Sequence, residues 1–128
     1  MGGPAIKVFI VDDSVAVCER IKNMLSELPG IKVAGQAHTR REALDCIKEL
    51  HPDVVILDIR MPGGSGIDVL KNIKNDQPSP RVIVFTNYPY PQYRKKCMDE
   101  GAELFLDKSR EFKKLIEILR QWGKSNAK

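Results

Sequence analysis

Short, mainly apolar runs without regular polar alternation recur along the chain and constrain its fold more than any other feature. The runs are Ile6 to Val11, Val33 to Ala37, Val54 to Leu57, Val82 to Phe85 and Leu104 to Leu106. Strands that are covered on both faces, as in a parallel sheet, have this pattern. The sequence therefore predicts five strands in a sheet that is buried on both sides.

Segments with helical spacing of apolar residues lie between these runs. Their stripes are Cys18, Ile21, Leu25 and Leu28; Ala43, Leu44, Ile47 and Leu50; Ile67, Leu70 and Ile73; and Phe112, Leu115, Ile116, Leu119 and Trp122. Only the segment from Tyr90 to Glu100 is weakly patterned, with Tyr93 and Cys97 as its apolar pair. Each run is thus expected to be followed by a helix.

The alternation of strands and helices predicts an α/β fold. Because right-handed crossovers are nearly obligatory, five such units form an open parallel sheet with helices on both faces. They match the flavodoxin-like (βα)5 arrangement with strand order 2-1-3-4-5. Thr39 and Glu42 form a capping box, and Ser109 is a suitable N-cap for the last helix. The 128 residues fit one domain with a core over about 6–122, and 123–128 are expected to fray or to begin a linker.

The composition is that of an ordinary globular chain, with 42% hydrophobic and 30% charged residues. The N-terminus has no basic stretch followed by an apolar core, so we expect a cytoplasmic protein that does not enter a membrane. The formal net charge of +4 comes with no nucleic-acid motif, so direct nucleic-acid binding is not expected. Cys18, Cys46 and Cys97 are widely spaced and predict reduced thiols. His38 and His51 lie without acidic or thiol companions and receive no role.

Polar side chains stand at the ends of four of the five predicted strands. Asp12 and Asp13 follow the first run, Asp58 the third, Thr86 the fourth and Lys108 the fifth. In an open α/β sheet, ligands bind outside the carboxyl ends of the strands, where the strand order reverses. These five residues are therefore expected to converge at one edge of the sheet.

Electrostatics limits what such a cluster can do. Two like charges ~4 Å apart repel by about 4 kcal/mol at an effective dielectric constant near 20, so three carboxylates need cations. Lys108 supplies one, and a divalent ion such as Mg²⁺, which binds carboxylates and keeps positions for phosphoryl oxygens, suits the rest. The chain contains no glycine-rich nucleotide motif. The cluster therefore favours a site that handles a phosphoryl group alone.

The order and type of these residues resemble the receiver domains of two-component response regulators, over nearly the whole chain from about Ile6 to Trp122. The resemblance is carried by the segments from Val8 to Ser14, from Asp53 to Gly66, from Val82 to Thr86 and from Gly101 to Lys108. Each segment alone is a weak signal. Together, in this order and each at a strand end, they are highly specific.

The resemblance implies a role for each polar residue. Asp58 is the phospho-acceptor, which takes a phosphoryl group from a phosphohistidine on a sensor histidine kinase or a phosphotransfer protein. Lys108 and the hydroxyl of Thr86 hold phosphoryl oxygens. The ion, Mg²⁺ or Mn²⁺, is bound by Asp13 and Asp58 directly, by Asp12 mainly through water, and by the backbone carbonyl of Arg60. The protein is then a signalling phospho-acceptor that promotes its own phosphorylation and dephosphorylation, and not an ordinary enzyme.

The resemblance also implies a switch. When phosphoryl oxygens draw Thr86 inward, an aromatic residue on the fifth strand, Phe105 here, turns toward the space left behind. The surface formed by Tyr90 to Glu100, the fifth strand and the last helix then changes shape. Its implied recipient is a downstream effector protein or a fused output domain, and a phosphorylation-dependent dimer is a further implied assembly.

Several positions depart from the commonest pattern of this family. Asn87 is bulkier than the small residue usual there, and Arg60 and Tyr88 flank the expected path of attacking water. We expect these three residues to slow hydrolysis of the acyl phosphate. Ser109 replaces a proline whose peptide bond is commonly cis, and because a cis bond before Ser109 would cost about 3 kcal/mol, we expect a trans bond.

Other interpretations remain open. Each polar residue could be structural: Asp12 and Asp13 as helix caps, Asp58 in a turn, Thr86 bonded to the backbone and Lys108 as a solvated charge. Polar residues would then have to stand at the ends of four strands by chance. Their joint pattern therefore favours a functional site. A receiver-like adaptor that works without phosphorylation is the main alternative function. A metal-dependent phosphatase is a third, disfavoured because no second acid follows Asp58 at short spacing.

Overall fold

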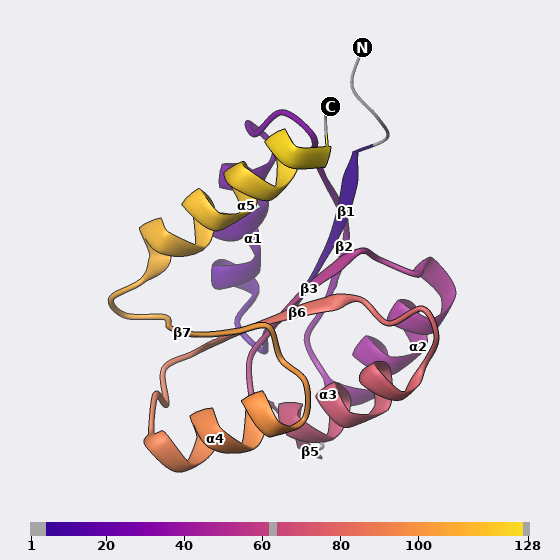
Figure 1. Cartoon of the computed structure of the whole chain (residues 1–128), viewed down its shortest axis with the longest axis vertical. Coiled ribbons are helices and arrows are strands. Elements are labelled where there is room, and N and C mark those ends of the chain that lie inside the picture. The colour runs from indigo at the N-terminus through magenta and orange to yellow at the C-terminus, as the bar shows by residue number, and fades with distance from the viewer. Residues whose placement is uncertain (1–4, 62–63, 127–128) are drawn as a thin grey trace.

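The computed structural model describes residues 5–61 and 64–126 of the chain (Figure 1). The elements in chain order are β1 (Ile6–Val11), α1 (Val15–Leu25), β2 (Ile31–Ala37), α2 (Arg40–Leu50), β3 (Val54–Leu57), β4 (Arg60–Met61), β5 (Gly64–Ser65), α3 (Gly66–Asn75), β6 (Arg81–Thr86), α4 (Pro91–Asp99), β7 (Leu104–Asp107) and α5 (Phe112–Asn126). Within the described ranges, no helix has both the length and the apolar character needed to cross a membrane.

The central sheet has five strands in the order β2-β1-β3-β6-β7, and every pair in it is parallel. Counted along the chain, these strands have the predicted order 2-1-3-4-5, so the flavodoxin-like fold is confirmed. β1 and β3 have the predicted bounds, whereas β2 begins two residues earlier than its apolar run, at Ile31. The short antiparallel hairpin of β4 and β5, two residues after β3, has no apolar run in the sequence and was not predicted.

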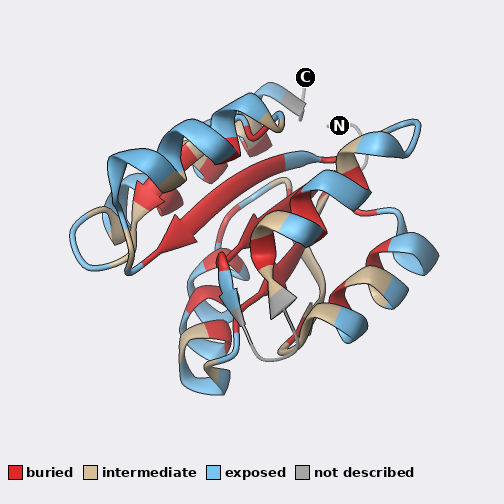
Figure 2. Ribbon diagram, turned by 90° about the horizontal axis from the view of Figure 1, so that it is seen from below, coloured by how far each residue is buried: buried red, intermediate tan, exposed pale blue. Residues whose placement is uncertain are grey.

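Helices cover both faces of this sheet, with α1 and α5 on one face and α2, α3 and α4 on the other (Figure 1). Alternate residues of β1 enter two separate hydrophobic clusters, with Val8 and Ile10 facing α1 and α5 while Phe9 and Val11 face the other three helices. The strands and the inner faces of the helices are accordingly buried, and the outer helix faces are exposed (Figure 2). Burial on both faces explains why the strand sequences lack polar alternation.

Side chains cap the first three helices at their N-termini. Ser14, Thr39 and Ser65 each accept a hydrogen bond from a backbone amide in the first turn of α1, α2 and α3. The predicted pair of Thr39 and Glu42 is confirmed, since Thr39 Oγ1 accepts from the amide of Glu42 at 3.2 Å. These caps set the starts of helices that directly follow strand ends.

The prediction that Ser109 caps the last helix is wrong, because α5 begins at Phe112. The amide of Ser109 instead donates to the carboxylate of Asp107 at 2.8 Å, and the amide of Asp107 donates to the carboxylate of Glu111 at 2.9 Å. These local hydrogen bonds form a turn after β7 that delays the start of the helix.

The last helix, α5, continues through Gly123 to Asn126, and residues 127–128 lie outside the described part. The fraying, or start of a linker, expected over 123–128 stays a prediction. Gly123 is buried against the loop before β2: a Cβ on Gly123 would lie 2.7 Å from the carbonyl oxygen of Pro29, and one on Gly30, which has a φ of +79°, would lie 2.6 Å from the carbonyl oxygen of Gly123. Two glycines therefore allow this close approach.

Leu50 was predicted to belong to the apolar stripe of α2, but the residue is 40% exposed. Leu70 of α3, in contrast, is fully buried. We expect Leu70→Ala to lower the free energy of unfolding by about 3 kcal/mol, since it leaves a cavity in the core. Leu50→Ala should cost less than about 1 kcal/mol. Urea denaturation followed by circular dichroism measures both values, and equal losses would contradict this description of the core.

Candidate functional site

The carboxyl ends of the central strands surround an open cavity of about 450 Å³. It is lined by Asp12, Asp13, Ser14, Val17, Asp58, Arg60, Asn87, Tyr88 and Lys108. These residues come from the segments that follow β1, β3, β6 and β7. The convergence expected from the sheet topology is therefore present for Asp12, Asp13, Asp58 and Lys108.

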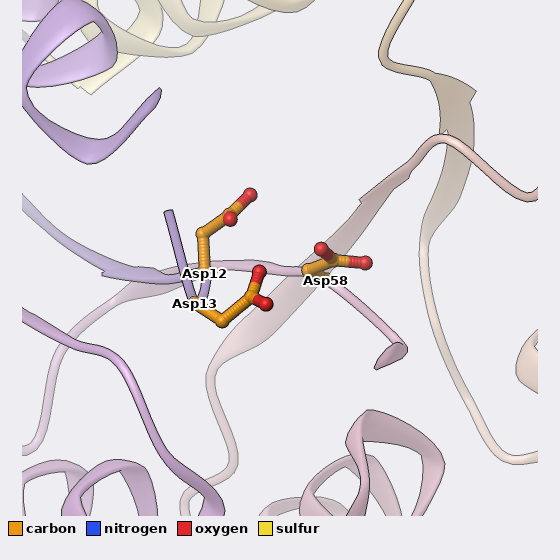
Figure 3. A group of neighbouring side chains, drawn as sticks. All are labelled: Asp12, Asp13 and Asp58. Carbon is orange, nitrogen blue, oxygen red and sulfur yellow. The ribbon is translucent and has the colours of Figure 1, made fainter. Parts of the chain in front are cut away.

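Three carboxylates meet in this cavity. Asp12, Asp13 and Asp58 each offer an oxygen, and these oxygens all lie within 4.8 Å of one another. Figure 3 shows the three side chains side by side, with the Asp13 carboxylate directed toward Asp58. Asp12 and Asp58 are only 2% and 5% exposed, whereas Asp13 is exposed. The backbone amides of the two buried residues extend the sheet, donating to the carbonyls of Ala37 and Val11.

The Lys108 ammonium neutralises part of this charge. Its Nζ lies 2.5 Å from Asp12 Oδ2 and 3.0 Å from Asp58 Oδ2, and its side chain is 10% exposed. Three carboxylates and one ammonium leave a formal charge of −2. A bound divalent cation would therefore balance the cavity.

Burial and charge shift the pKa values of this cluster. Burial raises the pKa of Asp12 above its ordinary value, and the nearby charge of Asp58 adds to this, although Lys108 and the amide of Ser14 oppose it. For Lys108, burial lowers the pKa, but the hydrogen bond to Asp12 and the charges of Asp58 and Asp12 outweigh burial and raise it. Lys108 thus stays protonated at neutral pH, while ionised Asp12 is held at a free-energy cost.

The residues present fit a hard divalent ion. Carboxylate oxygens are the ligands that Mg²⁺ prefers, and a site with one or two protein carboxylates leaves positions for water and phosphoryl oxygens. Asp58 Oδ1 accepts a hydrogen bond from the amide of Arg60 at 3.3 Å, so the backbone of Arg60 runs directly beside the carboxylates. The contribution of the Arg60 carbonyl as a ligand stays a prediction.

Gly66, the first residue of α3, lies close against the backbone of Asp58 and Ile59. The amide of Gly66 donates to the carbonyl of Ile59 at 2.8 Å, and a Cβ at Gly66 would lie only 2.1 Å from the Asp58 carbonyl oxygen. Any larger residue would displace the segment that carries Asp58. The sequence reasoning missed this role of Gly66, and Pro62 and Gly63 of the same motif lie outside the described residues.

Thr86 does not line the cavity in this structure. It is fully buried at the end of β6, and its Oγ1 accepts a hydrogen bond from the amide of Tyr88 at 3.1 Å. The amide of Lys108 donates to the carbonyl of Thr86 at 2.8 Å, which ties the ends of β6 and β7 together. The contact of Thr86 with phosphoryl oxygens stays a prediction.

Residues that depart from the family pattern form the rim of the cavity. The Arg60 guanidinium stacks over the Tyr88 ring at 4.4 Å, and Ser109 Oγ donates to Asn87 Oδ1 at 3.2 Å. The peptide bond before Ser109 is trans, as predicted, since the cis bond found in the described chain precedes Pro78. The first contact joins the segments that follow the neighbouring strands β3 and β6, and the second joins those that follow β6 and β7.

Phe105, the predicted switch residue, is 4% exposed and packs in the cluster that faces α2, α3 and α4. Arg94 of α4 donates to the carbonyl of Phe105 at 3.3 Å, and its guanidinium lies 5.8 Å from the centre of the ring. The ring is therefore already buried in this structure. Its turning stays a prediction.

The expectation that His38 has no thiol companion is wrong. Its Nδ1 lies 2.9 Å from the carbonyl oxygen of Asp12 and 3.8 Å from the Sγ of Cys18. No sequence spacing signals this contact, because it joins the ends of β1 and β2 to α1. The three cysteines are free, and burial raises the pKa of the Cys18 thiol to about 12. Cys18 is therefore a packed thiol and not a reactive thiolate.

The chain is similar in sequence to known response regulators. The family model described as "Response regulator receiver domain" matches residues 8–120. "Response regulator GacA" of Pseudomonas aeruginosa is 33% identical over 116 residues, which are 91% of this chain and 54% of that protein. A "Protein-glutamate methylesterase/protein-glutamine glutaminase 1" of Methanosarcina mazei is 34% identical over 134 residues, which cover 98% of this chain and 37% of the relative. The chain thus spans about half or less of these curated relatives.

Solved structures agree with the family match. The response regulator domain of Thermotoga maritima CheB has a TM-score of 0.83 at 29% identity, covering 95% of this chain and 96% of that one. The CheX-CheY-BeF3-Mg+2 complex from Borrelia burgdorferi contains a chain with a TM-score of 0.77 at 30% identity, with 90% of each chain covered.

The raised pKa of Asp12 predicts the pH dependence of folding without divalent ions. A raised folded-state pKa stabilises the protein below the ordinary value of 3.8, and this contribution is lost as the pH rises through the folded-state pKa. We therefore expect Asp12→Asn, which stays neutral, to gain stability relative to the unsubstituted protein as the pH rises from 3.5 to 7. Urea midpoints in EDTA measure this difference.

The matched control for this experiment is Asp45→Asn, which neutralises an exposed aspartate of α2 far from the cluster. Its urea midpoints should follow those of the unsubstituted protein across the same pH range. An Asp12→Asn variant that loses stability relative to the unsubstituted protein as the pH rises would show that ionised Asp12 is favourable in the fold.

Proposed function

Because this chain belongs to the response regulator receiver domain family, we propose that it is a signalling switch controlled by phosphorylation of Asp58 with Mg²⁺ bound beside it. The observation that carries this proposal is the meeting of Asp12, Asp13, Asp58 and Lys108 in one cavity from three different strand ends. Membership of the family supports the general role in two-component signalling.

The proposed reaction is the transfer of a phosphoryl group from a phosphohistidine to the Asp58 carboxylate. An Asp58 oxygen bonds to phosphorus while the phosphorus–nitrogen bond breaks, and the bonding electron pair returns to the imidazole of the donor. Asp13, Asp58 and the carbonyl of Arg60 would hold the ion, with Asp12 contributing through water, and the bound ion would neutralise charge on the phosphoryl oxygens. Phosphoryl transfer needs positioning and charge neutralisation more than covalent assistance.

The chain's own groups prepare Asp58 for this reaction. Lys108 Nζ binds one carboxylate oxygen of Asp58 at 3.0 Å, and the amide of Arg60 binds the other at 3.3 Å, so the carboxylate has a fixed orientation. In the phosphorylated protein, Lys108 would bind a phosphoryl oxygen. Thr86 would donate its hydroxyl hydrogen to another, since its oxygen already accepts from the amide of Tyr88.

The proposed partners follow from the same reaction. A sensor histidine kinase or a phosphotransfer protein supplies the phosphoryl group. A downstream effector, or an output domain in a longer chain, would recognise the surface of α4, β7 and α5, beneath which Phe105 is buried. A phosphorylation-dependent dimer would use this surface too. The partial coverage of the curated relatives, 54% and 37% of their lengths, supports the proposal of a fused output domain in proteins of this kind.

Phosphorylation of Asp58 is testable with a small phosphodonor. Incubation with Mg²⁺ and acetyl phosphate should add one phosphoryl mass, measured by intact mass spectrometry, and a beryllofluoride titration should saturate at one site. Asp58→Asn should gain no mass, because the attacking carboxylate is absent. The matched control Asp53→Asn, at the opposite end of β3, should be phosphorylated normally. An unmodified chain, or an Asp58→Asn variant that still binds its partner, would favour the adaptor that works without phosphorylation.

We further propose that the rim slows hydrolysis of the acyl phosphate. Arg60, Asn87 and Tyr88 line the cavity, and they are held by the stacking of Arg60 over Tyr88 and by the hydrogen bond between Ser109 and Asn87. A cation–π contact at an exposed site contributes about 0.5–1 kcal/mol, which corresponds to a change in rate of about two- to fivefold.

Tyr88→Ala is therefore expected to shorten the lifetime of the phosphorylated protein by about two- to fivefold. Asn87→Ala, which removes the hydrogen bond from Ser109, should shorten it as well. Tyr88→Phe is the control, because it keeps the ring that Arg60 contacts and should retain the original lifetime. A time course of phosphoryl loss measures these rates. Unchanged hydrolysis in both alanine variants would contradict the proposed role of the rim.

A further inference from the structure

Two side chains outside the cavity lining, those of His38 and Cys18, contact the backbone carbonyl oxygen of Asp12. His38 Nδ1 lies 2.9 Å from this oxygen and Cys18 Sγ lies 3.6 Å from it. A carbonyl oxygen only accepts hydrogen bonds, so His38 must carry its proton on Nδ1, and Cys18 must donate as a thiol. The pKa of Cys18, raised by burial to about 12, agrees with a thiol at this place.

The ring of His38 is itself held from its other side. Its Nε2 lies 3.3 Å from Gln36 Nε2 in β2, and its backbone amide donates to Glu42 Oε1 of α2 at 3.1 Å. With the proton on Nδ1, Nε2 of a neutral imidazole is an acceptor, which matches the amide donor of Gln36. His38 therefore connects the end of β2 to the turn between β1 and α1 with a defined ring orientation.

This connection acts on the peptide group that joins two of the three carboxylate residues. The carbonyl of Asp12 is part of the planar peptide between Asp12 and Asp13, so fixing its oxygen also fixes the direction in which the chain continues into Asp13. Asp13 is exposed, yet its carboxylate lies within 4.8 Å of those of Asp12 and Asp58. Something other than burial must keep it there.

We propose that His38 is a positioning residue for the metal site, which orients the Asp12–Asp13 peptide so that the Asp13 carboxylate faces Asp58. This inference rests on the proposed function, because the cation that these carboxylates would bind is the one required for phosphorylation. Removal of a group that orients a metal ligand without binding the metal itself typically lowers metal affinity by about 10–100-fold. A purely structural His38 would affect stability and leave Mg²⁺ affinity unchanged.

Isothermal titration calorimetry with Mg²⁺ as the probe distinguishes these roles. His38→Leu keeps the volume but lacks the donor, so its Mg²⁺ affinity should fall by about tenfold or more. His38→Asn should restore most of the affinity, because its side-chain amide places a donor at the same number of bonds from the backbone as Nδ1. Ile73→Val, a core change on α3 that costs about 1 kcal/mol, is the control for stability loss and should bind Mg²⁺ normally.

The outcomes separate this inference from the proposed function. Equal Mg²⁺ affinity of His38→Leu and the unsubstituted protein would overturn the positioning role while leaving the switch intact. Equal weakening in His38→Leu, His38→Asn and Ile73→Val would also overturn it, since stability loss would then be the cause. If the unsubstituted protein bound no Mg²⁺ and gained no phosphoryl group, both proposals would fall together.

Discussion

The mutual repulsion of three carboxylates is the constraint on which this structure depends. Carboxylates ~4 Å apart repel by about 4 kcal/mol per pair at an effective dielectric constant near 20, and burial makes the ionised form of Asp12 less favourable still. Lys108 offsets part of this repulsion, although it lies 96 residues from Asp12 in the sequence. The parallel sheet makes this pairing feasible, because it brings the ends of β1, β3 and β7 to one edge. The remaining negative charge makes the site receptive to a cation, and a bound cation would in turn attract phosphoryl oxygens.

The sheet and its acidic cluster could be predicted because both follow from patterns that ignore side-chain detail. Apolar runs without alternation indicate buried parallel strands, and the handedness of crossovers then fixes the strand order. Once that order is known, Asp12, Asp58 and Lys108 must share an edge, whatever their exact rotamers. Their separation along the chain was therefore no obstacle, and the family resemblance added the individual roles.

Other features escaped prediction because they depend on contacts between particular atoms. Ser109 is a residue type suited both to a helix N-cap and to a turn, and only the carboxylates of Asp107 and Glu111 decide in favour of the turn. Gly66 is one of several glycines in its motif. Only the structure shows that a side chain at this position would collide with the backbone of Asp58. His38 looked isolated in sequence, since its contacts with Asp12 and Cys18 arise from the packing of β2 and α1.

The hydrogen bond between the amide of Tyr88 and the hydroxyl of Thr86 joins two parts of the molecule that the proposed function treats separately. Tyr88 lines the cavity and stacks against Arg60. Thr86 is the group proposed to bind a phosphoryl oxygen. A displacement of that hydroxyl would therefore act on the backbone of Tyr88, whose side chain lines the cavity. The lifetime of the acyl phosphate and the response of Thr86 to phosphorylation would then depend on the same hydrogen bond. Substitutions that prolong the lifetime would therefore also change how the signal is transmitted.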